Sequence, residues 1–174
     1  MNKLGGFKYN YSVFSVSQSI NSDEVIKLIR NQKGGVVHFQ VLNPTFLVSD
    51  KQIVSALFHT ERAFQNNKNI ARDFSTEFLV RLAGKRQISN AIDFLGIKDS
   101  NTDIMFIAFG KQKKQVEQEF SSFLDIISEI IEIKKQKQLP LLELKDLALH
   151  YQCEKNLEVI EKKALEIIAT VEIL

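Results

Sequence analysis

The sequence predicts an α+β protein with a small, largely antiparallel sheet of three or four strands, flanked by six or more helices. Short apolar or alternating stretches indicate the strands, longer stretches with apolar residues at helical spacing indicate the helices, and the helical share grows toward the C-terminus. The strands do not follow strict βαβ alternation, which argues against a Rossmann sheet. At 174 residues we expect a single domain over 1–174, with 110–151 as a helical extension of uncertain role.

The first strand is expected at Phe7–Val16, where the apolar alternation changes phase at Phe14. The change of phase indicates either a bulge or a strand that is buried on both faces. A helix is expected over about 22–32, because Asn21 and Glu24 have the spacing of a capping box.

Glycine and proline mark the next boundaries. Gly34 and Gly35 favour the end of the first helix, and the alternating stretch 36–42 predicts the second strand. Asn43 precedes a proline and therefore avoids helical geometry, so the strand ends there. Residues 45–48 are interpreted as a further short strand.

Helices dominate the middle of the chain. Ser49 and Gln52 have capping-box spacing and open a helix with an apolar face. Two more helices are expected over about 71–83 and 85–95, separated by Gly84.

The last third predicts one strand and further helices. The short apolar run Ile104–Phe109 indicates a central strand. A helix or broken pair is expected over about 112–137, with an apolar stripe too wide for a two-stranded coiled coil. Pro140 suits the first turn of a helix to about 151. The last helix, over about 155–172, has one apolar face made of Leu157, Ile160, Ala164, Ile167, Ile168 and Val171.

Composition narrows the class of protein. The net charge is only +2, so any contact with RNA must come from a local patch. The single Cys153 excludes an internal disulfide and indicates a reducing compartment. Nothing near Met1 resembles a signal peptide, and no apolar run approaches the roughly 20 residues that span a bilayer. We expect a soluble, cytoplasmic protein.

The sequence lacks the usual motifs of an active site. Neither GxGxxG nor GxxxxGK[ST] occurs, so no glycine-rich phosphate loop is expected. His38, His59 and His150 lie far apart and share no metal-ligand spacing with Cys153. We therefore expect no enzymatic activity, no catalytic residues, no metal and no cofactor.

One segment suggests a phosphate site. Glu77 and Arg81 form an i,i+4 pair, worth about 0.2–0.5 kcal/mol on a helix surface. Residues 85–87, Lys-Arg-Gln, are expected to open a helix, where cations oppose the helix dipole. Free N–H groups beside these cations would seat a phosphate. The alternative is that Arg86 only pairs with a carboxylate such as that of Asp93.

This segment, with the strand 39–43 before it, resembles the archaeal and eukaryotic PRPK-binding protein (TPRKB-like) family of KEOPS subunits. The family pattern is a strand ending in Gln-x-Leu-Asn, then Glu-x-Leu-x-Arg-x-x-Gly-x-Arg-Gln-Ile-x-x-Ala-Ile-x-x-x-Gly. The matching residues are Gln40, Leu42, Asn43, Glu77, Leu79, Arg81, Gly84, Arg86, Gln87, Ile88, Ala91, Ile92 and Gly96. The likeness covers about 36–109 and the last thirty residues or so, whereas 110–140 departs from the family.

The resemblance implies a non-catalytic subunit of KEOPS, the complex that installs threonylcarbamoyl on adenosine 37 of tRNA. Such a subunit binds the kinase-like ATPase subunit and the 3′ CCA end of tRNA. By position, the candidate RNA-binding residues are Lys68, Arg72, Arg81, Lys85, Arg86 and Gln87. Phe58 and Phe74 are candidates for base stacking, although core positions suit them better. The candidate kinase-binding residues are Ile160, Ala164, Ile167 and Val171.

The sequence leaves alternatives open for the last helix, for RNA binding and for the oligomeric state. Simple burial predicts the same apolar arc on the last helix as partner binding does. A protein-only adaptor or regulator of a kinase, without direct RNA binding, would use the basic segment for intramolecular pairs. A weak homodimer of the isolated protein through the partner-binding face also fits the sequence.

Overall fold

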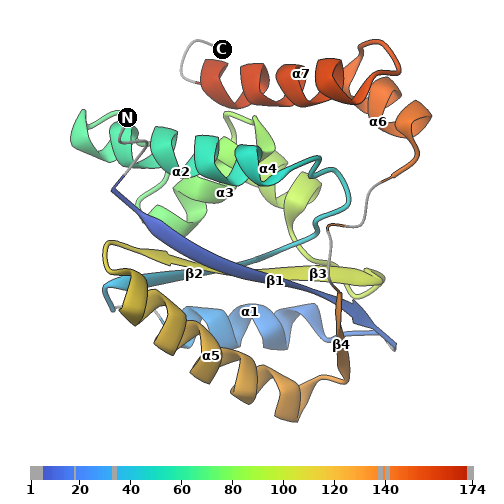
Figure 1. Ribbon diagram of the computed structural model, residues 1–174. Helices are drawn as coiled ribbons and strands as arrows, with labels where there is room; N and C mark the ends of the chain where they lie inside the picture. The colour runs from blue at the N-terminus through green and yellow to red at the C-terminus, as the bar shows by residue number, and fades with distance from the viewer. Residues whose placement is uncertain (1–5, 18, 33–34, 137–138, 140–141, 172–174) are drawn as a thin grey trace. The chain divides into compact units, whose positions relative to one another are not determined.

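The computed structural model describes residues 6–17, 19–32, 35–136, 139 and 142–171, and it confirms the α+β class (Figure 1). Over these residues there are seven helices and one four-stranded antiparallel sheet. The chain forms two compact units, a sheet unit and a helical unit. The sheet unit comprises residues 6–44 and 95–138, and the helical unit comprises residues 45–94 and 139–174.

The sheet unit is built around a central apolar strand, as expected. The strand order is β2-β3-β1-β4, with the strands at Lys8–Val16 (β1), Val37–Leu42 (β2), Asp103–Gly110 (β3) and Ile133–Gln136 (β4). Helices α1 (Ser22–Asn31) and α5 (Lys113–Ile130) cover one face of this sheet (Figure 1). Their apolar side chains meet those of the strands in one core, which includes Phe39, Phe106 and Phe123.

The change of phase in β1 reflects burial on both faces. The pairing of β1 with β3 runs without interruption from Lys8 opposite Gly110 to Ser15 opposite Asp103, so β1 has no bulge there. Val13 and Phe14 are neighbours and therefore point to opposite faces of the sheet. Both are buried, at 3% and 5% exposure.

The expected helix over 112–137 is too long, and α5 ends at Ile130. Ile131 has extended backbone angles, and the chain continues into β4, which pairs with the edge of β1. β-branched residues pack well on a pleated surface, which favours an extended chain here. Pairing with β1 also gives hydrogen-bond partners to the backbone groups of β4, which no longer have partners within a helix. The segment 110–151 is therefore not wholly helical, and residues 133–136 complete the sheet.

The expected short strand at 45–48 is also wrong. Thr45 and Phe46 lie in a turn. Side chains, not a neighbouring strand, bind the backbone here: the Tyr151 hydroxyl donates to the Phe46 carbonyl, and Gln52 Oε1 accepts from Val48 N–H. With these polar groups satisfied locally, the segment has no need of a ladder.

The helical unit contains five helices, at Asp50–Gln65 (α2), Phe74–Ala83 (α3), Ile88–Leu95 (α4), Leu144–Tyr151 (α6) and Leu157–Thr170 (α7). Helix α2 packs against α3 and α7, and α7 packs against α6. A core between α6 and α7 includes Leu147, Tyr151 and Ile160. Leu157, expected on the apolar face of α7, is 46% exposed. The expected boundary residues Gly34 and Pro140 lie outside the described residues.

Local sequence explains where these helices begin. Asn21 caps α1 by accepting from Glu24 N–H, as the capping-box spacing predicts. The Gln52 half of the second capping box is formed, because its Oε1 accepts from Ser49 N–H. Asp73 caps α3 by accepting from Thr76 N–H. Within the described residues, no helix is long and apolar enough to cross a membrane.

Candidate nucleic-acid interface and partner groove

Gly84 fixes the junction between α3 and α4. It ends α3 in the left-handed conformation, with φ of 62°. A Cβ atom at this position would overlap the side chain of Ile167 on α7. Both the backbone angle and the close approach therefore require glycine, and the chain leaves α3 directly into the exposed Lys85.

The basic residues after Gly84 lie ahead of α4 and not in its first turn. Helix α4 begins at Ile88, and the Gln87 carbonyl accepts from Ala91 N–H. Lys85, Arg86 and Gln87 are all exposed. The prediction that Lys85 and Arg86 lie in the first turn of a helix, where they would oppose its dipole, is therefore wrong. The two cations lie just before the first residue of α4. Among the described contacts, Arg86 forms no ion pair with Asp93.

A cavity of about 370 Å³ lies within the helical unit beside Lys85. Two ammonium groups, those of Lys85 and Lys163, belong to its lining, together with Phe94, His150 and Tyr151. The size falls in the range of sites that hold small molecules or single nucleotides. The lining therefore combines cationic and aromatic side chains, and one of the two cations, Lys163, forms an ion pair with Glu166.

Two of the lining residues, Phe94 and His150, form a cluster of three rings with Phe46. The ring centroid of His150 lies 4.2 Å from that of Phe46 and 4.9 Å from that of Phe94, and the Phe46 and Phe94 centroids are 5.3 Å apart. Lys85 Nζ lies 5.5 Å from the centroid of Phe94, within cation–π range. Burial, and then the charge of Lys85, lowers the pKa of His150 below its ordinary value. The ring is therefore held neutral near pH 7.

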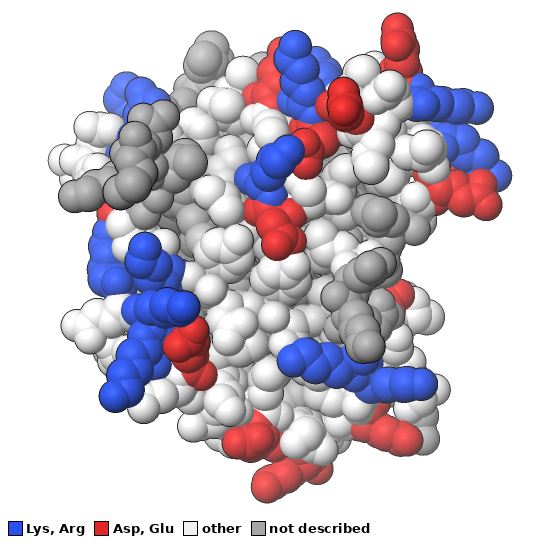
Figure 2. All heavy atoms as spheres, in the orientation of Figure 1, with Lys and Arg blue, Asp and Glu red and all other residues white. Residues whose placement is uncertain are grey.

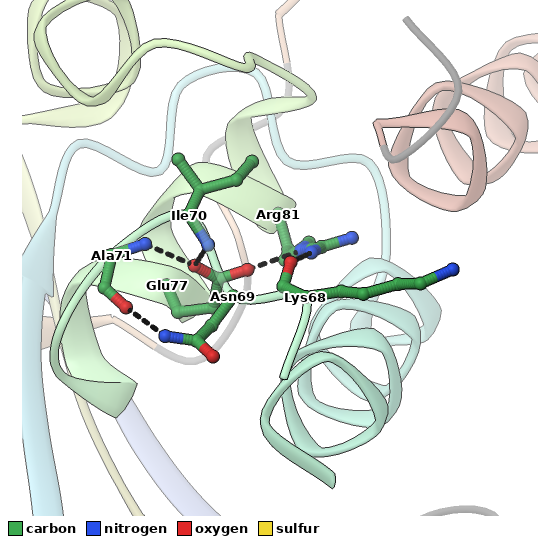
Figure 3. A network of polar contacts seen from close by, with 6 residues as sticks. All are labelled: Lys68, Asn69, Ile70, Ala71, Glu77 and Arg81. Atoms are coloured by element: carbon green, nitrogen blue, oxygen red, sulfur yellow. Dashed lines mark hydrogen bonds and ion pairs between the residues drawn. The ribbon is translucent and has the colours of Figure 1, made fainter. Parts of the chain in front are cut away.

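A buried ion pair lies beneath the loop between α2 and α3 (Figure 3). Arg81 Nε donates to Glu77 Oε1 at 2.8 Å, and both side chains are 0% exposed. The other carboxylate oxygen, Oε2, accepts from the N–H groups of Ile70 and Ala71, each at 2.7 Å. The expectation of a pair on the helix surface is wrong, because the face of α3 that carries it points into the unit.

The structure separates the six candidate RNA-binding residues into two groups. Lys68, Arg72, Lys85, Arg86 and Gln87 are exposed on the helical unit. Arg81 is fully buried, so its side chain cannot contact RNA directly and that assignment is corrected.

The two candidate stacking residues are half-buried. Phe74 stacks on Phe64 with ring centroids 4.0 Å apart, so one face of its ring is already covered. Phe58 does not line the cavity but lines a separate apolar groove between α2 and α7.

The four candidate kinase-binding residues mostly serve the unit's own core. Ile160, Ala164 and Val171 are at most 1% exposed, and Ile167 is half-buried against Gly84. The alternative interpretation, simple burial, is the correct one for the three buried residues. A partner cannot reach them in the folded protein.

Helix α7 has a second surface, which a partner protein could reach. A groove of about 540 Å³ runs between α2 and α7 and is mainly apolar. Its apolar lining residues are Val54, Phe58, Leu165 and Ala169, and Lys51, which also lines it, forms an ion pair with Glu161 at an N···O distance of 2.6 Å. No sequence pattern predicted this groove, because it combines side chains from two helices that are more than 90 residues apart.

The distribution of surface charge agrees with the small net charge. On the face drawn in Figure 2, Lys and Arg side chains lie among Asp and Glu over much of the surface and gather along the left edge with few acidic side chains between them. Within the described part of the chain, no three His, Cys, Asp or Glu side chains gather into a group that could hold a metal.

Comparison with known proteins identifies the family. The model of the family described as "Kinase binding protein CGI-121" matches residues 16–173. The "Regulatory protein Cgi121" of Methanocaldococcus jannaschii is 38% identical over 63 residues, which make up 36% of this chain and 41% of that protein. The resemblance inferred from the sequence is confirmed, and the chain belongs to the CGI-121 family of kinase-binding proteins.

Proposed function

We propose that this protein is a cytoplasmic, non-catalytic adaptor of the KEOPS complex, which binds the kinase-like ATPase subunit and the 3′ CCA end of tRNA. In that role it supports threonylcarbamoyladenosine modification at position 37. The observation that carries the kinase half is the match of nearly the whole chain to a kinase-binding family. The tRNA half rests on the charged cavity of the helical unit and the exposed cations of that unit.

The chemistry of the helical unit supports the tRNA half. A single-stranded RNA end is bound through cations that follow its phosphates and through pockets or aromatic groups that receive its bases. Lys68, Arg72 and Arg86 offer exposed cations. The cavity, lined by Lys85 and Lys163, is of a size to admit one terminal nucleotide.

The tRNA half is tested by binding of the purified protein to intact tRNA and to tRNA without its CCA end, at low and moderate salt. We expect tighter binding to the intact tRNA and a loss of affinity as salt rises. Arg86→Glu should weaken binding about tenfold, by replacing attraction to a phosphate with repulsion. Lys98→Glu makes the same charge change on the sheet unit and should weaken binding much less. Equal or absent binding of the two RNAs would remove direct tRNA recruitment.

For the kinase half we propose the apolar groove between α2 and α7 as the docking surface. Open apolar surface of this kind commonly receives a helix of a partner. Leu165→Arg should abolish co-elution with the kinase-like subunit in size-exclusion chromatography, because it places a charge in the apolar lining of the groove. Leu149→Arg is the matched control, since Leu149 is apolar and 79% exposed on α6. Equal co-elution of both variants would exclude the groove.

The second candidate function is an adaptor that binds protein only. The net charge of only +2 favours it, since such a charge gives no strong overall attraction to nucleic acid. The salt titration separates the two functions, because only the first requires contacts with phosphates.

A further inference from the structure

The loop between α2 and α3 presents two cations of the proposed RNA surface. Lys68 and Arg72 are both exposed, whereas Asn69 and Ile70 between them are half-buried and Ala71 is buried. Ala71 is 1% exposed, and its N–H and that of Ile70 donate to the buried carboxylate of Glu77. The backbone that separates the two cations is therefore attached to the interior of the helical unit.

Arg81 extends this attachment to the start of the loop. Its Nε donates to Glu77, and its Nη2 donates to the Lys68 carbonyl at 3.4 Å. Within the loop, Asn69 Nδ2 donates to the Ala71 carbonyl at 2.9 Å. The side chains of Glu77 and Arg81 thus bind three backbone groups of the loop, the Lys68 carbonyl and the N–H groups of Ile70 and Ala71 (Figure 3).

Stability alone does not explain a buried ion pair at this place. Well-packed apolar residues of similar volume usually replace such a pair at no loss of stability. Apolar side chains, however, could not bind the N–H groups of Ile70 and Ala71 or the carbonyl of Lys68. What the ion pair adds is a fixed backbone path between the two exposed cations.

We infer that Glu77 and Arg81 are positioning residues for RNA binding, which fix the spacing of Lys68 and Arg72 without contacting the RNA. The inference rests on the proposed function, since it concerns the same RNA surface. A loop that is ordered before binding loses less conformational entropy when it binds. Releasing the loop should therefore weaken tRNA binding even though both cations are retained.

The test is a double-mutant cycle on affinity for intact tRNA. Glu77→Gln removes the buried charge and should weaken binding about five- to tenfold, the range expected when one or two loop side chains must be ordered on binding. In a Lys68→Ala/Arg72→Ala background, the same change should alter the affinity less than about twofold, because the cations that it positions are gone. Equal weakening in both backgrounds, or none in either, overturns the positioning role.

Because Glu77→Gln could unfold the protein, Asn69→Ala provides a second route. It removes only the bond from Asn69 to the Ala71 carbonyl and leaves the buried ion pair intact. It should weaken tRNA binding about two- to threefold in the wild-type background and have no effect in the Lys68→Ala/Arg72→Ala background. Co-elution with the kinase-like subunit should stay unchanged, as loss of the fold would abolish it.

The outcomes separate the inference from the proposed function. If the wild-type protein binds no tRNA, the proposed tRNA role fails and the positioning role fails with it. If the wild-type protein binds tRNA and Lys68→Ala/Arg72→Ala weakens binding, while Asn69→Ala and a folded Glu77→Gln have no effect, only the positioning role is overturned.

Discussion

The sheet unit and the helical unit bury different chemistry. The core of the sheet unit consists of apolar side chains. The helical unit, by contrast, holds most of the buried polar and charged side chains of the described chain, which are Gln52, Thr60, Glu61, Glu77 and Arg81. Ser12 is the corresponding residue of the sheet unit.

The buried polar side chains of the helical unit serve to hold irregular backbone in place, whereas the apolar core of the sheet unit serves packing. Buried polar groups contribute little net stability when they are satisfied and cost much when they are not. In the helical unit, Gln52 binds the turn before α2 and Glu77 binds the loop before α3. Both segments are irregular backbone in the unit that carries the candidate RNA surface. In the sheet unit, the hydrogen bonds between strands satisfy the backbone, so buried polar side chains are not needed for that purpose.

The largest expected effect comes from breaking the buried ion pair. Arg81→Ala should lower the free energy of unfolding by about 3–5 kcal/mol, because it leaves the carboxylate of Glu77 buried without its charged partner. Lys113→Ala is the matched control from the sheet unit, where Lys113 forms an exposed i,i+4 pair with Glu117. That change should cost at most about 0.5 kcal/mol. Urea unfolding measures both, and similar losses would contradict the contrast between the units.

The next effect concerns a buried amide. Gln52→Ala should lower the free energy of unfolding by about 1–3 kcal/mol, since Val48 N–H then lacks its acceptor. Gln115→Ala in the sheet unit removes only a bond to the Glu119 side chain on the same helix and should change stability by less than about 0.5 kcal/mol. The same urea titrations test this pair, and a harmless Gln52→Ala would show that the turn needs no side-chain acceptor.

A smaller effect is expected from glycine. Gly84→Ala should cost about 1–2 kcal/mol for the left-handed backbone, with a further loss from the overlap with Ile167. In the sheet unit, a Cβ at Gly35 would meet only ordinary contacts at 3.8–3.9 Å, so Gly35→Ala should be close to neutral. Thermal unfolding compares the two, and an unchanged melting temperature for Gly84→Ala would contradict the strained junction.

The smallest expected effect is a dependence of the free energy of unfolding on pH, through His150. The pKa of His150 is lowered in the folded protein from the ordinary value of 6.5, so the unfolded chain binds this proton more readily. The free energy of unfolding should therefore fall as the pH drops from about 7 through the lowered pKa, and should not depend on this group above pH 7. His150→Gln should flatten the profile measured between pH 7.5 and 5.5. Parallel profiles for wild type and variant would show that His150 is not responsible.

Local signals were sufficient for much of the fold. The apolar run of β3 and the cap of α1 depend on neighbouring residues, and both were predicted from the sequence. The strand β4 was missed because the apolar stripe of α5 continues past Ile130, and only pairing with β1 decides that the chain becomes extended there. Long-range partners override local periodicity in such segments.

The site was harder to predict than the fold. The sequence indicated the exposed Lys85, Arg86 and Gln87, because charged residues after a helix-ending glycine are usually exposed. It misplaced Arg81, since an i,i+4 pair has the same spacing on a buried face as on an exposed one. The α2–α7 groove and the cavity combine helices far apart in sequence, so no local pattern could reveal them.

Hydrogen–deuterium exchange of the protein with and without intact tRNA would show directly whether the helical unit binds the 3′ end. If the helical unit binds the 3′ end, exchange should slow at residues 68–73 and 85–94, while the exposed loop 98–102 of the sheet unit stays unchanged. tRNA without its CCA end should produce weaker protection at the same residues. Protection of 98–102 with an unchanged helical unit would contradict the proposed site, and unchanged exchange throughout would contradict tRNA binding itself.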